Sequence, residues 1–233
     1  MSATPPPKAT PEIAQPEMIY IKVPVGMLQC NCSIIGDPKT LEAIVIDPGD
    51  EVERLLDLLG RYKLSVKAIL STHAHIDHVG GLAKLHQYTG APVMMHGADL
   101  PLYNAMEMQA AFLGVAPPPL TTVDHLLKEG DPISWGGYFG SILHTPGHTP
   151  GSVCLYMPKD AGRVQLAQPH LFAGDTLFAG SIGRTDLWGG SFEEIMESLK
   201  EKVLQLPEDT MVYPGHGSNT TIGQERDSNP FLR

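Results

Sequence analysis

Apolar and polar residues alternate over short stretches along much of this chain, a period of two that favours β-strands. The stretches are rich in β-branched side chains and are bounded by turn residues, as at 36–38 and 47–50. We predict strands over 18–25, 28–36, 42–47, 66–71, 92–96, 133–144, 152–157, 170–174 and 211–214. The turns between the first of these strands predict hairpins.

A helical period separates several of the strands. We predict helices over 51–62, 76–88, 99–113 and 192–206. Ser191 precedes Glu194 by three positions, which predicts a capping box at the start of the last helix. Met106, Met108 and Phe112 form a stripe that is more typical of packing than of a substrate cover. Strands with helices interspersed predict the α/β class, with mixed sheets covered by helices.

Length and composition fit one domain. The chain has 233 residues, of which 42% are hydrophobic, so we predict a single domain over 18–233. Residues 1–17 contain five prolines and few large apolar side chains, which predicts a disordered leader. No stretch approaches the ~20 apolar residues of a membrane span or has the apolar run of a signal peptide. We therefore expect a cytoplasmic protein without a membrane partner.

Net charge and cysteine content indicate which partners and which redox state to expect. The formal net charge is −10 and no basic stripe is visible, which argues against nucleic acid as a partner. The three cysteines, Cys30, Cys32 and Cys154, lie in strand-like runs, so we expect reduced thiols. We interpret Cys30 and Cys32 as structural residues whose sulfurs point to opposite faces of their strand.

The densest chemistry of the chain lies in Ser71–His78. Three imidazoles and one carboxylate, His73, His75, Asp77 and His78, fall within six positions. The apolar run before them reads as a buried strand, and Gly80-Gly81-Leu82 after them opens a helix. Loops at strand ends are where α/β sheets build their sites, so the segment predicts a metal site.

Three more side chains complete a ligand set. His148, Asp175 and His216 each lie at the end of a strand-like run beside glycine, which lets the backbone turn sharply into a shared cleft. Imidazole and carboxylate suit zinc, iron and manganese alike. Two metal ions about 3.5–4 Å apart need about seven such ligands, one of them shared. The sequence thus predicts a dinuclear centre.

These motifs resemble the metallo-β-lactamase superfamily. The resemblance rests on His-x-His-x-Asp-His at 73–78, Thr-Pro-Gly-His-Thr-x-Gly at 145–151, Gly-Asp-x-Leu-Phe at 174–178 and Pro-Gly-His-Gly at 214–217. Within the superfamily the chain is most similar to short, single-domain glyoxalase II-like hydrolases. That similarity rests on Gly183-Arg184-Thr185-Asp186 and Asn229-Pro230-Phe231.

The resemblance implies a four-layer αββα sandwich of two mixed sheets flanked by helices. It implies that His73, His75 and His148 hold the first metal, that Asp77, His78 and His216 hold the second, and that Asp175 bridges them. The cofactors would be two divalent ions, zinc before iron or manganese. A metal-bridging hydroxide would then attack a carbonyl, with Asp77 orienting it.

The implied activity is that of a hydroxyacylglutathione hydrolase, which cleaves a small acyl thiolester such as S-lactoylglutathione. Arg184 falls where such enzymes place a basic side chain near the thiolester, and His96 ends a strand near the expected cleft; both are candidate substrate-binding residues. Larger glyoxalase II enzymes hold glutathione with an additional C-terminal domain. Ser218 stands where many of them have a tyrosine that contacts glutathione.

Several alternatives stay open at this point. A persulfide dioxygenase shares part of these motifs but uses a single iron, and a lactonase would use the same carbonyl chemistry. Nucleases of the superfamily usually carry a basic surface, which this acidic chain lacks, and secreted β-lactamases carry an export signal. The physiological partner is expected to be a small thiolester, and a monomer and a homodimer fit equally well.

Overall fold

The computed structural model describes residues 17–233, and the chain begins with a six-stranded sheet. Its strands lie in the order β1-β2-β3-β4-β5-β6: β1 (Ile19–Val25), β2 (Cys30–Gly36), β3 (Glu42–Ile46), β4 (Ser65–Leu70), β5 (Val93–His96) and β6 (His125–Leu127). The first three pair antiparallel, which confirms the predicted hairpins, and the others pair parallel. Parallel neighbours need crossover connections.

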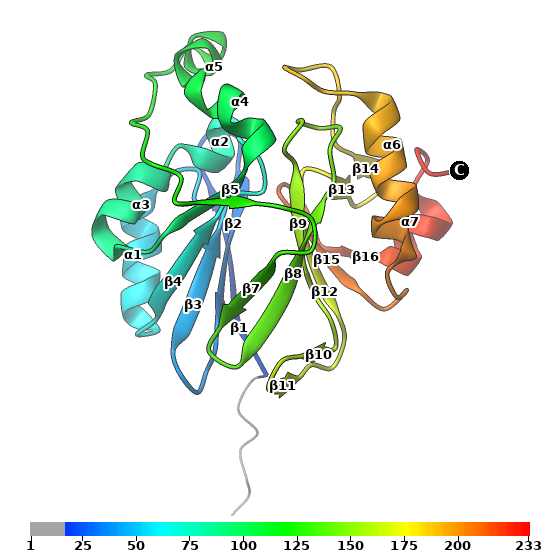
Figure 1. Cartoon of the computed structure of the whole chain (residues 1–233), viewed down its shortest axis with the longest axis horizontal. Coiled ribbons are helices and arrows are strands. Elements are labelled where there is room, and N and C mark those ends of the chain that lie inside the picture. The colour runs from blue at the N-terminus through cyan, green and yellow to red at the C-terminus, as the bar shows by residue number, and fades with distance from the viewer. Residues whose placement is uncertain (1–16) are drawn as a thin grey trace, which may run out of the picture.

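Those connections are helical. They contain α1 (Val52–Arg61), α2 (Ile76–Val79), α3 (Leu82–Thr89), the 3₁₀ turn η1 (Gly97–Asp99), α4 (Leu100–Asn104) and α5 (Met106–Leu113). Figure 1 shows α1 and α3 on the outer face of the first sheet.

The second half of the chain forms another six-stranded sheet. Its order is β16-β15-β12-β9-β8-β7: β16 (Thr220–Thr221), β15 (Met211–Pro214), β12 (His170–Gly174), β9 (Val153–Met157), β8 (Tyr138–His144) and β7 (Pro132–Trp135). The outer helices are α6 (Phe192–Glu201), the 3₁₀ turn η2 (Val203–Gln205) and α7 (Ile222–Ser228). Two short hairpins join β10 (Asp160–Ala161) to β11 (Val164–Gln165) and β13 (Leu177–Phe178) to β14 (Ser181–Ile182).

The molecule is a four-layer sandwich, as predicted: helices, sheet, sheet, helices (Figure 1). Alternation along the strands explains the layers, because neighbouring residues of a strand point to opposite faces. In β4, Ile69 packs towards α1 and α3, whereas Leu70 packs between the sheets. In β12, Phe172 packs between the sheets and Leu171 packs towards α6. These strands therefore have apolar side chains packed on both faces of the sheet.

Two elements differ from the sequence prediction because of paired glycines. The run 133–144 is a hairpin, since Gly136-Gly137 forms a two-residue turn between β7 and β8. The helix predicted over 76–88 breaks into α2 and α3 at Gly80-Gly81. The carbonyl oxygen of Pro48 lies so close that a Cβ at Gly81 would be 2.2 Å from it. The β3–α1 loop therefore packs directly on this break.

Half of the predicted capping box is present: the Ser191 hydroxyl accepts from the Glu194 N–H at 3.2 Å, whereas the Ser191 N–H donates to the Gly147 carbonyl at 2.8 Å. The strand β6, the helix α7 and the short strands β10, β11, β13, β14 and β16 were not predicted. They are two to seven residues long, too short to show a period.

The expectation about the cysteines was wrong in its geometry. Residues two apart on a strand share a face, and Cys30 and Cys32 both pack in the core between the first sheet and its helices. All three thiols are buried and unpaired with one another, so the structural interpretation holds for these described residues.

The predicted leader over residues 1–17 lies outside the described residues except for Glu17. That residue packs on the domain, where its backbone carbonyl accepts from the Tyr138 hydroxyl and its carboxylate accepts from the Ala167 N–H at 2.9 Å. Among residues 17–233, no helix is long and apolar enough to cross a membrane.

Candidate metal centre

The histidine-rich segment leaves the end of β4 and leads into α2, so its side chains project from the edge of the first sheet. The Ser71 hydroxyl donates to the His73 carbonyl at 2.8 Å, which fixes the turn. His73, His75 and His78 are all buried.

One cluster consists of His73, His75 and His148. The Nε2 atoms of His73 and His148 lie 3.2 Å apart, and the His75 Nε2 is buried without a hydrogen-bond partner. His148 Nδ1 donates to the Arg184 carbonyl at 2.8 Å, because a carbonyl can only accept. Its Nε2 is therefore unprotonated in the neutral ring and faces the cluster.

A second cluster consists of Asp77, His78 and His216. The Nε2 atoms of His78 and His216 lie 3.3 Å apart, and His216 Nε2 lies 3.2 Å from a carboxylate oxygen of Asp77. In each of the two clusters, one ligand atom per residue lies within 4.8 Å of the others.

Asp175 follows β12 and contacts both clusters. Its Oδ1 lies 3.5 Å from His78 Nε2, and its Oδ2 lies 3.6 Å from His148 Nε2. Its Oδ1 is buried and has no hydrogen-bond partner. The structure thus brings together all seven predicted ligands, with Asp175 between the two sets.

This arrangement fits divalent cations. Ring nitrogens of different histidines face one another at about hydrogen-bond distance, and two buried acceptors beside them have no donor. Hydrogen bonds within the cluster therefore do not satisfy these atoms. Imidazole nitrogens and carboxylate oxygens are the donor set that zinc, iron and manganese share. The chain therefore carries a metal-binding centre of the His/Asp type, and this donor set leaves the choice of metal open.

The two clusters differ in protonation. Burial, and then the neighbouring imidazoles, lower the pKa of His75 to about 3 and hold that of His73 well below its usual value. Burial also lowers the pKa of His216, but the hydrogen bond to Asp77 and the charge of Asp175 outweigh it, so the net shift is upward. His78 is likewise raised well above its usual pKa, against its burial, by Cys30 and the nearby carboxylates.

Asp47 belongs to the site, although its sequence context predicted only a strand end and a turn. Its Oδ2 accepts from the Thr72 hydroxyl at 2.6 Å and lies 3.0 Å from His78 Nδ1. Because the Thr72 hydroxyl donates to Asp47, its oxygen accepts from His73 Nδ1 at 3.1 Å. Asp47 thus directs the Nε2 atoms of one histidine from each cluster towards the centre. An acid at the end of an apolar strand before Pro-Gly was the available signal.

Asp99 and Gln109 join the segments that carry the first cluster. The buried Asp99 carboxylate accepts from Ala74 N–H, Gly151 N–H and the Thr149 hydroxyl at 2.6–2.8 Å. Gln109 accepts from Ile76 N–H at 2.9 Å and donates to the Ala74 carbonyl at 2.9 Å. No sequence motif identified either residue, since the partners that connect them to the first cluster lie 25 to 52 positions away.

Gly215 is required by close packing. A Cβ there would lie 2.1 Å from Asp175 Oδ1 and 2.7 Å from the His78 ring. The chain before His216 can pass the centre only without a side chain.

The end of the chain supports the loop after Asp175. Asn229 is buried and donates to the Ser181 carbonyl at 3.0 Å and to the Glu225 carboxylate at 2.8 Å. Glu225 in turn accepts from Gly180 N–H at 2.8 Å. Asn229, the first residue of the Asn-Pro-Phe motif, therefore anchors that loop.

The centre lies on the floor of a cavity of about 460 Å³. Trp188 covers His75, with ring centroids 5.9 Å apart, and Phe112 packs edge-on against Trp188 at 5.3 Å. Phe112 thus lines the cavity, contrary to the interpretation of its stripe as packing, whereas Met106 is buried in the core.

Of the two candidate substrate-binding residues, only Arg184 reaches this cavity. Its guanidinium forms a bidentate pair with Asp186 at 2.7 and 2.9 Å. The structure does not bring His96 to the cavity: its ring stacks on His144 with centroids 3.9 Å apart, and its Nδ1 accepts from Ala98 N–H. That stacking holds the side chain in place.

The chain belongs to the metallo-β-lactamase superfamily: residues 25–216 match the family model described as the metallo-beta-lactamase superfamily. It is a metallo-hydrolase of this superfamily, and the fold and the resemblance read from the motifs are confirmed.

Individual relatives cover nearly the whole chain. The hydroxyacylglutathione hydrolase GloC of Haemophilus influenzae is 39% identical over 90% of this chain and 96% of its own length. The crystal structure of the B3 metallo-beta-lactamase BLEG-1 has a TM-score of 0.83 at 39% identity and covers 92% of this chain and 99% of its own. A di-iron-bound form of TTHA1623 has a TM-score of 0.78 at 42% identity, with 91% and 100% covered.

Proposed function

We propose that this protein is a dinuclear metal-dependent hydrolase that cleaves a small acyl thiolester, as a glyoxalase II-like enzyme does. The observation that carries the proposal is the convergence of His73, His75 and His148 with Asp77, His78 and His216 on either side of Asp175. Two complete sets favour a dinuclear hydrolase over a dioxygenase with a single iron. The similarity to GloC supports the thiolester as substrate class.

Divalent cations bound by the two sets would lower the pKa of a water molecule and polarise the substrate carbonyl oxygen. In the hydrolysis, one water is consumed, a C–O bond forms at the acyl carbon and the C–S bond breaks. The products are a carboxylic acid and a thiol, and no oxidant or reductant takes part.

The side chains around the centre would orient the attacking water. Burial raises the pKa of Asp77, but the imidazoles of His78 and His216 outweigh it and bring the net pKa below the usual range. Asp77 is therefore ionised near neutral pH and accepts a hydrogen bond from the attacking water. Trp188 and Phe112 form an apolar wall of the cavity beside His75.

Hydrolysis of S-lactoylglutathione tests the activity. With protein loaded separately with zinc, iron or manganese, we expect thiol release with kcat/KM of at least about 10⁴ M⁻¹s⁻¹ for one metal. His75→Ala should remove it, because the variant lacks a ligand of the first cluster. Since the His75 Nε2 has no hydrogen-bond partner, the substitution breaks no hydrogen bond of that atom. Folded, metal-loaded protein that releases no thiol from this or any other small thiolester would refute the proposal.

β-Lactam hydrolysis is a second candidate, favoured by the similarity to BLEG-1. Attack on a β-lactam carbonyl needs the same centre, but the leaving group is an amide nitrogen that stays attached to the product. We expect the thiolester to be preferred by about 100-fold or more in kcat/KM, since thiolate is the better leaving group. A chromogenic cephalosporin assayed in parallel checks this, and a preference for it would reverse the order of the candidates.

We expect the two clusters to lose metal at different pH. Histidine binds a metal only when deprotonated, so a raised pKa means that protons compete. The lowered pKa of His73 and His75 keeps the first set available on acidification, whereas the raised pKa of His78 and His216 makes the second set release its metal first.

Zinc-loaded protein should accordingly keep about two ions per chain at about pH 8 and about one after dialysis at about pH 5.5. Elemental analysis of the dialysed protein measures this. Loss of both ions over the same pH interval would contradict the assignment.

A further inference from the structure

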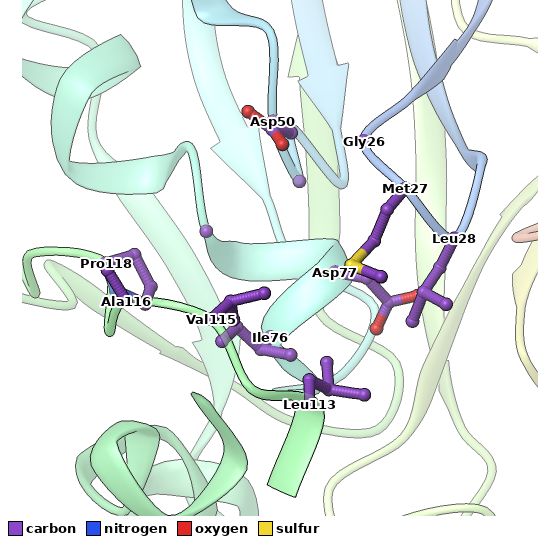
Figure 2. A pocket seen from close by; sticks show the side chains of 12 residues that line it. Gly26, Met27, Leu28, Asp50, Ile76, Asp77, Leu113, Val115, Ala116 and Pro118 are labelled. Atoms are coloured by element: carbon purple, nitrogen blue, oxygen red, sulfur yellow. The ribbon is translucent and has the colours of Figure 1, made fainter. Parts of the chain in front are cut away.

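A groove runs from the metal centre along the surface of α2. It has a volume of about 230 Å³ and lies between the β1–β2 turn and the segment after α5. Figure 2 shows Met27 and Leu28 reaching in from the turn, and Leu113, Val115 and Ala116 from the other side. The roles proposed above make no use of it.

The groove adjoins the cavity above the metal centre. Leu28, Ile76, Asp77 and Leu113 line both. Since Asp77 is a member of the second ligand cluster, the groove begins beside the centre, within reach of a substrate whose reacting carbonyl lies there.

The walls of the groove are apolar and partly exposed to solvent. The Met27 side chain is 71% exposed and Val115 is 39% exposed, and both flank the groove. Exposed apolar side chains that gather around a concavity mark a binding site for an apolar ligand.

Charge excludes an anionic occupant. Asp50 and Asp77 are acidic, and none of the described residues that line the groove is basic. A carboxylate beside Asp50 would meet like charge with no basic side chain in the lining to offset it, at an energetic cost. An uncharged hydrocarbon chain meets no such penalty.

The two halves of a thiolester can then be placed. Arg184, the cation of the main cavity, does not line the groove, so a polar or anionic thiol half has its partner outside the groove. That leaves the groove to the acyl half.

We propose that the groove binds the apolar acyl chain of the substrate, and that the enzyme prefers medium-chain acyl thiolesters to lactoyl or acetyl thiolesters. This inference rests on the proposed thiolester hydrolysis. With about 30 Å³ per water-sized group, the groove has room for several methylene groups.

Two substrate series test the placement. In the first, the acyl chain of N-acetylcysteamine thiolesters is lengthened from acetyl to octanoyl; in the second, the thiol of acetyl thiolesters is lengthened. We expect kcat/KM in the first series to rise about two- to fourfold per methylene until the groove is filled, and to stay nearly flat in the second.

A binding measurement supplies a readout without turnover. Calorimetric titration with alkyl carboxylates from acetate to octanoate should show the same gain in affinity per methylene. Octanoate bound no more tightly than acetate would overturn the proposal.

Substitutions in the groove test whether the groove causes the dependence of kcat/KM on acyl-chain length. Ala116→Phe should fill the groove and lower the octanoyl-to-acetyl ratio of kcat/KM by about tenfold or more. Met27→Ser should lower it less, because it removes one wall only. Tyr88→Ser, at an exposed aromatic side chain that lines neither cavity, is the matched control and should keep the ratio.

The failures are distinguishable. If neither series is hydrolysed, the proposed function fails. If both are hydrolysed but only the thiol series depends on length, or if neither does, the acyl groove is refuted while hydrolysis stands. If Ala116→Phe changes the oligomeric state in sedimentation and leaves the ratio unchanged, the groove is covered by a second copy of the chain instead.

Discussion

Asp175→Asn is expected to lower thiolester hydrolysis by about a thousandfold or more and to leave about one metal ion per chain. The Asp175 carboxylate lies between the clusters, within 3.7 Å of ring nitrogens of His78, His148 and His216. A carboxylate between two dications offsets their mutual repulsion, and an uncharged amide of the same size does not. Steady-state kinetics and elemental analysis of the same preparation measure both effects.

The exposed Asp227 on α7 offers a matched control for this substitution. Asp227→Asn makes the same chemical change away from the centre, so both the rate and the metal content should match those of the wild type. Asp175→Asn protein that keeps two ions and most of its rate would show that this carboxylate does not bridge metals.

Asp99→Ala is expected to destabilise the fold by about 3–5 kcal/mol, which lowers Tm by about 10 °C for a chain of this size. The variant leaves the Ala74 and Gly151 N–H groups and the Thr149 hydroxyl buried without their acceptor. Because these groups lie beside His73, His75 and His148, zinc affinity should also fall, by about 10- to 100-fold.

Asp99→Asn separates the loss of the hydrogen bonds from the loss of volume and charge. Its amide oxygen still accepts, so the destabilisation should be clearly smaller than that of the alanine variant. Thermal unfolding of both variants, with and without zinc, makes the comparison. An alanine variant within about 1 kcal/mol of the wild type would contradict the role given to Asp99.

The seven ligand candidates could be found in the sequence because each lies in or next to a short motif at a strand end. Strand ends next to glycine, as before His148 and His216, can be recognised in the local sequence. The period of two predicted the strands, whereas their division into two sheets was implied by the resemblance. The four layers were implied by the resemblance to the superfamily, and the structure explains them by strands with apolar side chains on both faces.

What could not be predicted depends on contacts between distant segments. Asp99 and Gln109 read as ordinary polar residues of a helical stretch, and only folding reveals which backbone groups they satisfy. The break between α2 and α3 depends on the approach of Pro48, some 33 positions earlier. The acyl groove joins the β1–β2 turn to the end of α5, and nothing in either segment alone indicates a concavity.

The seven proposed metal ligands are divided between the two halves of the sandwich. His73, His75, Asp77 and His78 follow β4 of the first sheet, whereas His148, Asp175 and His216 come from loops of the second. An ion bound there connects the two sheets. Because it binds only the folded chain, its binding raises the free energy of unfolding. The stability of the folded protein should thus depend on the concentration of free metal ion around it.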